Sequence, residues 1–403
     1  MAFTFTPLNQ SWIEPASEFV NSQFPEAVAT LGKLVKIPGI AWESFDSNSL
    51  DRSAAAVAAE LEALQMFDTV EIRRSAKPDG ELGAPAIVAR RAGASDAPHV
   101  LLYAHHDVQP PGARELWKTE PFEATLIGDR LFGRGASDDK SGIITHLYSL
   151  KTLKKLASSL RLGITVFIEG EEEAGSESFP NFLRENQADL AADLIIVADS
   201  GNWSEDVPAL TTSLRAMVSQ TFTIRTLDHA VHSGMYGGPL PDATGAMIKL
   251  LATLTDEQGN VAIAGLDSIP VDGPDLSDAE FGVAAGLLPG VKRLGTKSAT
   301  QQIWGEPAVT VIGMDIPQVD VSSNTAQPES RARISLRLAP SQDPDTGLEL
   351  LRQHISAYAP EGAVVEFGRS EKGPGYLAKN GWAAPMAHEA FGIAWQNPSV
   401  NIG

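Results

Sequence analysis

The sequence predicts an α/β protein with a partly parallel sheet and a smaller α/β domain inserted into the first. Two observations lead to this prediction. Short apolar or β-branched runs alternate with helical patterns through the first half of the chain, as in sheets whose strands are joined by helices. After about residue 211, long alternating runs flank two helical patterns, which indicates a second sheet.

The first elements are two amphipathic helices, at residues 24–36 and at 49–66, the second of which is rich in alanine. In the rest of the first domain, strands are predicted at residues 70–73, 86–90, 100–104, 164–169 and 194–198. Helices are predicted at residues 142–158 and 176–186. Chemistry in such sheets gathers at the carboxyl ends of the strands. The polar residues that follow the last three strands are therefore the first candidates for a site.

The inserted domain is predicted to span residues 212–374, and the first domain residues 1–211 plus 375–403. Pro and Gly residues near 373–375 indicate the return to the first domain. The later elements are predicted at residues 213–226, 331–339 and 363–368 for strands, and 243–254, 346–357 and 382–395 for helices. No element can be placed in the Gly-, Pro- and Asp-rich stretch 256–300.

Composition excludes several classes of protein. The 403 residues are enough for two domains with cores, and 31 Lys and Arg against 51 Asp and Glu give a net charge of −20. This charge argues against binding to nucleic acid or to anionic membranes. The lack of cysteine excludes disulfides, thiolate zinc sites and Cys nucleophiles. Residues 1–15 show no secretory pattern, and no apolar run approaches the roughly 20 residues of a membrane span, so we expect a cytoplasmic protein.

The first polar cluster follows the strand predicted at 100–104. Because side chains alternate along a strand, His105 and Asp107 can point the same way while His106 faces away. His105 could bind a metal ion, with Asp107 orienting its ring. The alternative is two polar residues at a strand end without any metal, and the triplet by itself does not decide between them.

The second cluster, Gly133–Gly142, contains Asp138 and Asp139 before a helix. Either aspartate could cap that helix, or one could bridge two cations. The spacing of the glycines is not that of a phosphate-binding loop, which argues against a nucleotide site.

The third cluster places four glutamates within residues 169–173, directly after an apolar strand. Such a run is usually an exposed acidic loop. Adjacent carboxylates can also divide the work, one binding metal while its neighbour takes a proton from water. Asp199 follows the strand at 194–198 and indicates little alone. In the inserted domain, glycines surround His232, whose ring could stabilise an oxyanion or lie in an exposed turn.

Taken together and in this order, these clusters resemble the two-zinc metallopeptidase family of carnosinase, cytosolic nonspecific dipeptidase, glutamate carboxypeptidase, aminoacylase and acetylornithine deacetylase. The resemblance runs from about residue 25 onward and is closest to the carnosinase-like branch. The matching stretches are AHHDVQPPG, LFGRGASDDKSG, FIEGEEEAGS, VADSGNW, HSGMYGG and ISLRLAPSQ. The resemblance implies a catalytic domain with a mixed, mostly parallel sheet covered by helices on both faces, and a ferredoxin-like lid and dimerisation domain.

The resemblance also implies roles for single residues. Glu172 would be the general base, and His232 would reach the active site of the partner subunit in a homodimer. Arg337 would hold the substrate carboxylate, as a guanidinium can do with two hydrogen bonds. The metal ligands would be His105, Asp138, Glu173 and Asp199, with Asp138 bridging two ions, Asp107 steadying the His105 ring, and a cis peptide bond between Asp138 and Asp139.

The implied function is hydrolysis of dipeptides or related small amino-acid amides by water that two divalent metal ions activate. Zinc is implied by the resemblance, and manganese or cobalt also suits these ligands. Two alternatives stay open: an N-acyl-amino-acid deacylase or carboxypeptidase of the same family, and a non-catalytic metal- or ligand-binding protein. The family's last histidine ligand would lie beyond residue 403, so we expect the 403-residue chain to bind the second metal poorly and to be weak or inactive.

Overall fold

The computed structural model describes residues 10–403 apart from Ser158 and Asn380. Two predictions fall partly outside the described residues. They are the lack of a secretory pattern, which includes residues 1–9, and the helix predicted to end at Ser158. The chain packs into two compact units, one ending at Gly201 and the other spanning Asn202–Gly403. The assignment of residues 375–403 to the first domain stays a prediction. No described helix is long and apolar enough to cross a membrane.

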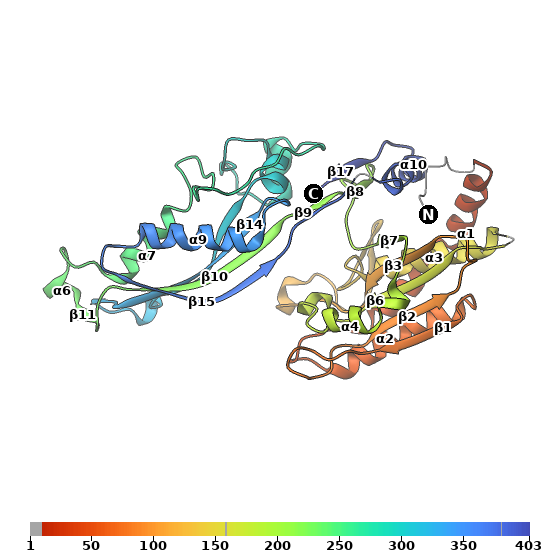
Figure 1. Cartoon of the computed structure of the whole chain (residues 1–403), viewed down its shortest axis with the longest axis horizontal. Coiled ribbons are helices and arrows are strands. Elements are labelled where there is room, and N and C mark those ends of the chain that lie inside the picture. The colour runs from red at the N-terminus through yellow and green to blue at the C-terminus, as the bar shows by residue number, and fades with distance from the viewer. Residues whose placement is uncertain (1–9, 158, 380) are drawn as a thin grey trace. The chain divides into compact units, whose positions relative to one another are not determined.

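The N-terminal unit is built on a five-stranded mixed sheet with the order β1-β2-β6-β3-β7 (Figure 1). β3 pairs in parallel with β6 and β7, whereas β2 pairs antiparallel with β1 and β6. The strands are β1 Thr69–Arg73, β2 Ala86–Arg91, β3 His99–His105, β6 Gly163–Glu169 and β7 Leu194–Val197. Each predicted strand is confirmed to within one residue at either end. The predicted mixed sheet is confirmed, but the expectation that it is mostly parallel is wrong, because two of its four strand pairings are antiparallel.

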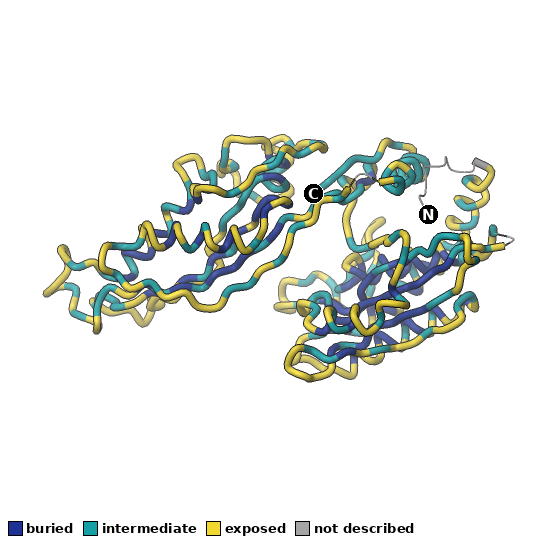
Figure 2. Tube along the Cα trace, viewed as in Figure 1, coloured by how far each residue is buried: buried dark blue, intermediate teal, exposed yellow. Residues whose placement is uncertain are grey.

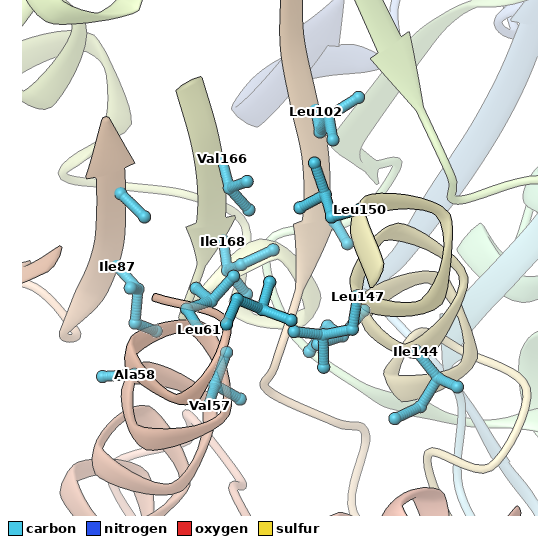
Figure 3. Packing of buried hydrophobic residues seen from close by; sticks show 14 of the residues in the cluster. Val57, Ala58, Leu61, Ile87, Leu102, Ile144, Leu147, Leu150, Val166 and Ile168 are labelled. Atoms are coloured by element: carbon cyan, nitrogen blue, oxygen red, sulfur yellow. The ribbon is translucent and has the colours of Figure 1, made fainter. Parts of the chain in front are cut away.

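Helices cover both faces of this sheet, as predicted. Because side chains alternate along β2 and β6, Ile87 and Val166 face α2 and α3, while Val88 and Phe167 face α4 and α5. Figure 3 shows the first of these layers, in which Leu61 and Leu147 meet the sheet. The helices are α1 Ile13–Val35, α2 Ser47–Ala63, α3 Lys140–Leu156, α4 Phe179–Glu185 and α5 Gln187–Leu190, and a small hairpin pairs β4 Thr125–Ile127 with β5 Arg130–Phe132.

The start of α1 was predicted wrongly, since the helix begins at Ile13 rather than at residue 24. Its first buried side chain is Ala27, so the preceding turns carry no buried apolar stripe that would reveal a helix. α2 begins earlier than predicted because Asp46 caps it, accepting the backbone N–H of Asn48 at 3.0 Å.

The C-terminal unit contains a four-stranded antiparallel sheet of order β12-β14-β10-β15. The buried side chains of β10 and β14 pack against α7 and α9, and Figure 2 shows this buried core running along the strands. The larger elements are β10 Ala216–Arg225, α7 Ala243–Ala252, α8 Asp278–Ala284, β12 Ala308–Asp315, β14 Glu329–Leu338, α9 Pro344–Tyr358, β15 Val364–Gly373 and α10 Ala383–Trp395. The short elements are β8 Ala209–Thr211, β9 Ser213–Leu214, β11 Val231–His232, α6 Ser233–Tyr236, β13 Thr325–Ala326, β16 Tyr376–Leu377 and β17 Val400–Ile402.

The sequence did not predict β12 or α8. A register shift between Val311 and Gly313 breaks the alternation of β12, and Val311 and Ile312 are exposed, so the strand lacks a regular period of two. The seven residues of α8 bury no side chain, and its capping box at Ser277 is its main sequence signal.

Candidate metal centre

His105 is the last residue of β3 and is fully buried. Its Nδ1 lies 3.1 Å from the backbone oxygen of Asp107 and 3.3 Å from the Oδ1 atom of that residue. Its Nε2 lies 3.1 Å from Oδ1 of Asp138 and 3.8 Å from Oδ2 of Asp199. Burial lowers the pKa of His105, but the hydrogen bond and charge of Asp107, with Asp139 and Asp199, raise it to about 10. These carboxylates therefore make a site that favours a cation.

His106 faces away from this site, as the alternation along the strand predicts. It is fully buried, with Nδ1 at 3.1 Å from Oγ of Ser53 and Nε2 at 2.8 Å from the backbone oxygen of Pro85. Burial lowers its pKa to about 4, so His106 is a neutral residue that joins α2 to the start of β2.

Asp138 and Asp139 have different environments, and a cis peptide bond joins them as the resemblance implies. Asp139 is buried and caps α3, accepting the backbone N–H of Gly142, while its other oxygen accepts the N–H of His105 at 3.1 Å. Asp138 is exposed, with 64% of its side chain accessible. Asp139 therefore takes the helix-capping role considered from the sequence, and the binding of a cation by its neighbour Asp138 stays a prediction.

The close approach of α3 to the sheet depends on Gly142. A Cβ atom at this position would lie 2.2 Å from the backbone oxygen of Ala198, the residue before Asp199. Any larger residue would push the helix start away from the end of β7. Gly142 therefore keeps the aspartates before α3 close to Asp199.

The acidic run after β6 is not an exposed loop. Glu169 is buried and accepts hydrogen bonds from Tyr103 and Ser176, while buried Glu171 accepts the backbone N–H groups of Ala84 and Ser178. These two carboxylates hold the loop in place, which leaves their neighbours Glu172 and Glu173 for other roles.

Asp107 fixes the position of Glu172 and Glu173. Its Oδ1 and Oδ2 accept the backbone N–H groups of Glu172 and Glu173 at 3.2 and 3.0 Å. Gln109 in turn donates to the Glu173 carboxylate at 2.7 Å and to its backbone oxygen at 3.2 Å. Sequence reasoning did not single out Gln109. Gln109 lies beyond the end of β3, where strand alternation no longer gives a signal.

Two groups of side chains in the described residues could hold a metal ion. One is His105, Asp138 and Glu173, and the other is His105, Asp139 and Asp199, with ligand atoms within 4.8 Å of one another. Histidine nitrogen and carboxylate oxygen suit zinc, manganese and cobalt. We favour Asp138 over Asp139 as a ligand because both oxygens of Asp139 already accept backbone N–H groups. The donor set therefore fits a divalent cation.

Glu172 is well placed to exchange protons. Burial raises its pKa to about 7, and the charges of Asp199 and Glu173 act in the same direction against that of His105. A carboxylate that titrates near neutrality can take and return a proton during a reaction. Burial also raises the pKa of Asp199 and of Glu173.

The other two predicted site residues belong to the C-terminal unit. His232 is exposed at the end of β11, and its Nδ1 accepts the N–H of Gly234 at 3.1 Å. Arg337 is exposed on β14 and lines a pocket within this unit. Their roles, and the histidine ligand expected beyond residue 403, stay predictions.

The fold and this centre define a class of protein, an α/β metallohydrolase most of whose candidate ligands follow adjacent strands of a mixed sheet. The chain belongs to peptidase family M20/M25/M40, whose model matches residues 101–390. It is 32% identical to the cysteinylglycine-S-conjugate dipeptidase of Corynebacterium striatum over 368 residues, which are 90% of this chain and 76% of that protein.

A further relative and a solved structure are also similar to this chain. The Beta-Ala-His dipeptidase of Rattus norvegicus is 25% identical over 370 residues, 87% of this chain and 75% of the relative. The crystal structure of human carnosine dipeptidase 1 has the same fold, with a TM-score of 0.78, 21% identity, and coverage of 98% of this chain and 88% of that one.

Proposed function

We propose that this protein hydrolyses dipeptides, or related small amino-acid amides, with two divalent metal ions and Glu172 as general base. One observation carries the proposal: Asp107 holds the backbone of both Glu172 and Glu173 while its carboxylate faces the ring of His105. One carboxylate thereby fixes the positions of the proposed general base and of two candidate metal ligands relative to one another. Hydrolysis requires such an arrangement, whereas a protein that only stores metal does not need a general base. Relatives that carry the name dipeptidase support this choice of substrate.

His105, Asp138 and Asp199 would hold one ion, and Asp138 and Glu173 would contribute to the second. When bound, such ions polarise a carbonyl and make water more acidic. Glu172 takes a proton from the attacking water and later delivers it to the leaving amine, which its pKa near neutrality permits. His232 of the partner subunit would stabilise the oxyanion in a homodimer, and Arg337 would bind the substrate carboxylate. Zinc as the metal and a cytoplasmic location complete the proposal.

Elemental analysis of the purified full-length protein, with amino-acid release from a dipeptide panel, tests this function. We expect two metal ions per chain, cleavage that a chelator abolishes, and a preference for free dipeptides over their N-acetylated forms. Preference for the N-acetylated form would establish the deacylase alternative. Metal binding without cleavage of either form would establish a non-catalytic binding protein.

A further inference from the structure

The N-terminal unit contains a pocket of about 220 Å³ that is separate from the candidate metal centre. Three segments form it: residues 40–50 at the start of α2, residues 74–84 between β1 and β2, and residues 171–177 after β6. None of the described residues that line the pocket is Glu172 or a candidate metal ligand. The pocket can therefore hold a ligand that does not contact the metal centre.

Hydrogen bonds hold the segment between β1 and β2 in place. The backbone N–H of Lys77 donates to the backbone oxygen of Glu81 at 2.7 Å. Arg74 donates to the backbone oxygen of Gly83 at 2.7 Å and also to a carboxylate oxygen of Asp51 in α2. This wall of the pocket is thus formed without a ligand, as the walls of most small-molecule sites are.

The charged groups that line the pocket differ in how well they are paired. Arg74 has the partners just described, and both oxygens of buried Glu171 accept backbone N–H groups. The ammonium group of Lys77 has no hydrogen bond to any described residue. Its ion pair with Glu177 spans 3.7 Å, longer than a hydrogen bond, although only 23% of the Lys77 side chain is accessible. Exposed Glu43 has no side-chain hydrogen bond or ion pair within the described part of the chain. One cation and one anion are thus available to a ligand.

Aromatic and aliphatic side chains form much of the remaining wall. Trp42, Phe45 and Leu82 line the pocket, yet 46%, 40% and 67% of these residues is exposed. The backbone N–H of Phe45 donates to the oxygen of Trp42 at 2.9 Å, and this turn keeps the two rings on one short loop. Covering such side chains with an apolar group removes their surface from water and is favourable. The pocket therefore suits a ligand with an apolar part and two groups of opposite charge.

We propose that this pocket binds a free α-amino acid with an apolar side chain. Lys77 donates hydrogen bonds to the carboxylate of the ligand, Glu43 accepts them from its ammonium group, and Trp42 and Phe45 cover its side chain. Hydrogen bonds between charged partners are the stronger kind, so both ends of the ligand contribute to affinity and selectivity. Binding here does not require hydrolysis. If the proposed function holds, the ligand is a product of the reaction that is held outside the metal centre.

Fluorine NMR on the full-length protein labelled with fluorotryptophan tests the site directly. The chain has 7 tryptophans, and Trp42→Phe identifies the signal of Trp42. We expect L-leucine to shift this signal, and Lys77→Gln to weaken the binding roughly 10- to 100-fold through loss of a hydrogen bond between charged groups. L-leucinamide and N-acetyl-L-leucine, which each lack one charge, should bind similarly weakly to the unsubstituted protein. Lys36→Gln, at an exposed position outside the pocket, is the control and should bind L-leucine normally. An unmoved Trp42 signal, or equal affinities in Lys77→Gln and Lys36→Gln, would overturn the proposal.

Hydrogen–deuterium exchange separates this site from the metal centre. L-leucine should slow exchange in residues 40–50 and 74–84, with and without prior treatment of the protein with a chelator, because a ligand of the native state stabilises the segments that it contacts. Glu43→Gln should abolish most of this protection. Protection that a chelator removes, and that persists in Glu43→Gln, would place the amino acid at the metal centre and refute the pocket. Protection without cleavage of any dipeptide would keep this proposal and reject only the proposed function.

Discussion

Asp107 connects two parts of the metal centre through one buried carboxylate. It faces Nδ1 of His105 and accepts the backbone N–H groups of Glu172 and Glu173. The residue's contribution is therefore to orient candidate ligands, and such partners typically affect metal affinity as strongly as some ligands do.

Asp107→Asn should weaken metal binding about 10- to 100-fold. The amide keeps the shape of the carboxylate but loses its charge, and its NH₂ group cannot accept the second backbone N–H. Competition with a chromophoric chelator would measure the affinity. Asp193→Asn is the control, since Asp193 accepts the N–H of His99 at the other end of β3. Equal affinities for both variants would show that Asp107 does not orient the ligands.

Substitution can distinguish the proposed role of Glu172 as general base from that of its neighbour Glu173 as metal ligand. Glu172→Gln should lower kcat roughly 10²- to 10⁴-fold, because the general base is lost, while the metal content stays unchanged. Elemental analysis and initial rates on the same preparation measure both quantities. Glu177→Gln, a change at an exposed residue of the same loop, should leave both unaffected. If Glu172→Gln instead lost metal, Glu172 would be a ligand and the assignment within the acidic run would be wrong.

At the scale of elements, buried Lys140 joins the start of α3 to the end of α1. Its Nζ donates to the backbone oxygens of Leu34 and Ile37 at 2.9 and 2.7 Å, and these oxygens also accept the backbone N–H groups of Ile37 and Gly39. Burial lowers the pKa of Lys140 to about 7, so this contact requires a costly desolvation. The contact places α1 beside the helix that follows the two aspartates of the metal centre.

Lys140→Met should destabilise the N-terminal unit by about 1–3 kcal/mol, because the carbonyl groups of Leu34 and Ile37 each lose one hydrogen bond, that from the ammonium group. Hydrogen–deuterium exchange should accelerate at the end of α1. Lys155→Met, at an exposed position of the same helix, supplies the control for the loss of charge. Unchanged exchange in Lys140→Met would mean that water replaces the ammonium group without cost.

How much the sequence predicts depends on how regularly an element is buried. The strands β2, β3 and β6 carry strong apolar runs, and their ends could be placed to within one residue. The exposed first turns of α1 and the bulged β12 have no regular period, so their formation depends on tertiary packing that no local pattern reports. Three of the four candidate ligands, His105, Glu173 and Asp199, could be placed because they follow predicted strands.

The hydrogen bonds that organise the site were harder to predict. Neither the hydrogen bond from the His105 N–H to Asp139 nor the one from Gln109 to the Glu173 carboxylate can be chosen from sequence, since they join residues 34 and 64 positions apart.

At the scale of the whole molecule, the predicted catalytic residues are divided between two units. The metal ligands and Glu172 belong to the unit ending at Gly201, and His232 belongs to the unit beginning at Asn202. The proposed homodimer would bring His232 of one subunit to the metal centre of the other. Sedimentation velocity tests the dimer itself, but only an experiment on catalysis tests the exchange of residues between subunits.

Mixing inactive variants makes that test. Each of Glu172→Gln and His232→Ala should be nearly inactive alone. In a mixed dimer, the subunit that keeps Glu172 receives the intact His232 of its partner, so one of its two sites is complete. With random reassortment half of the dimers are mixed, and activity should recover to about a quarter of the original. If His232 served its own subunit, every site would lack one residue and mixing would restore nothing. A recovery near zero, with mixed dimers shown by mass spectrometry, would therefore contradict the exchange between subunits while leaving the metal centre unaffected.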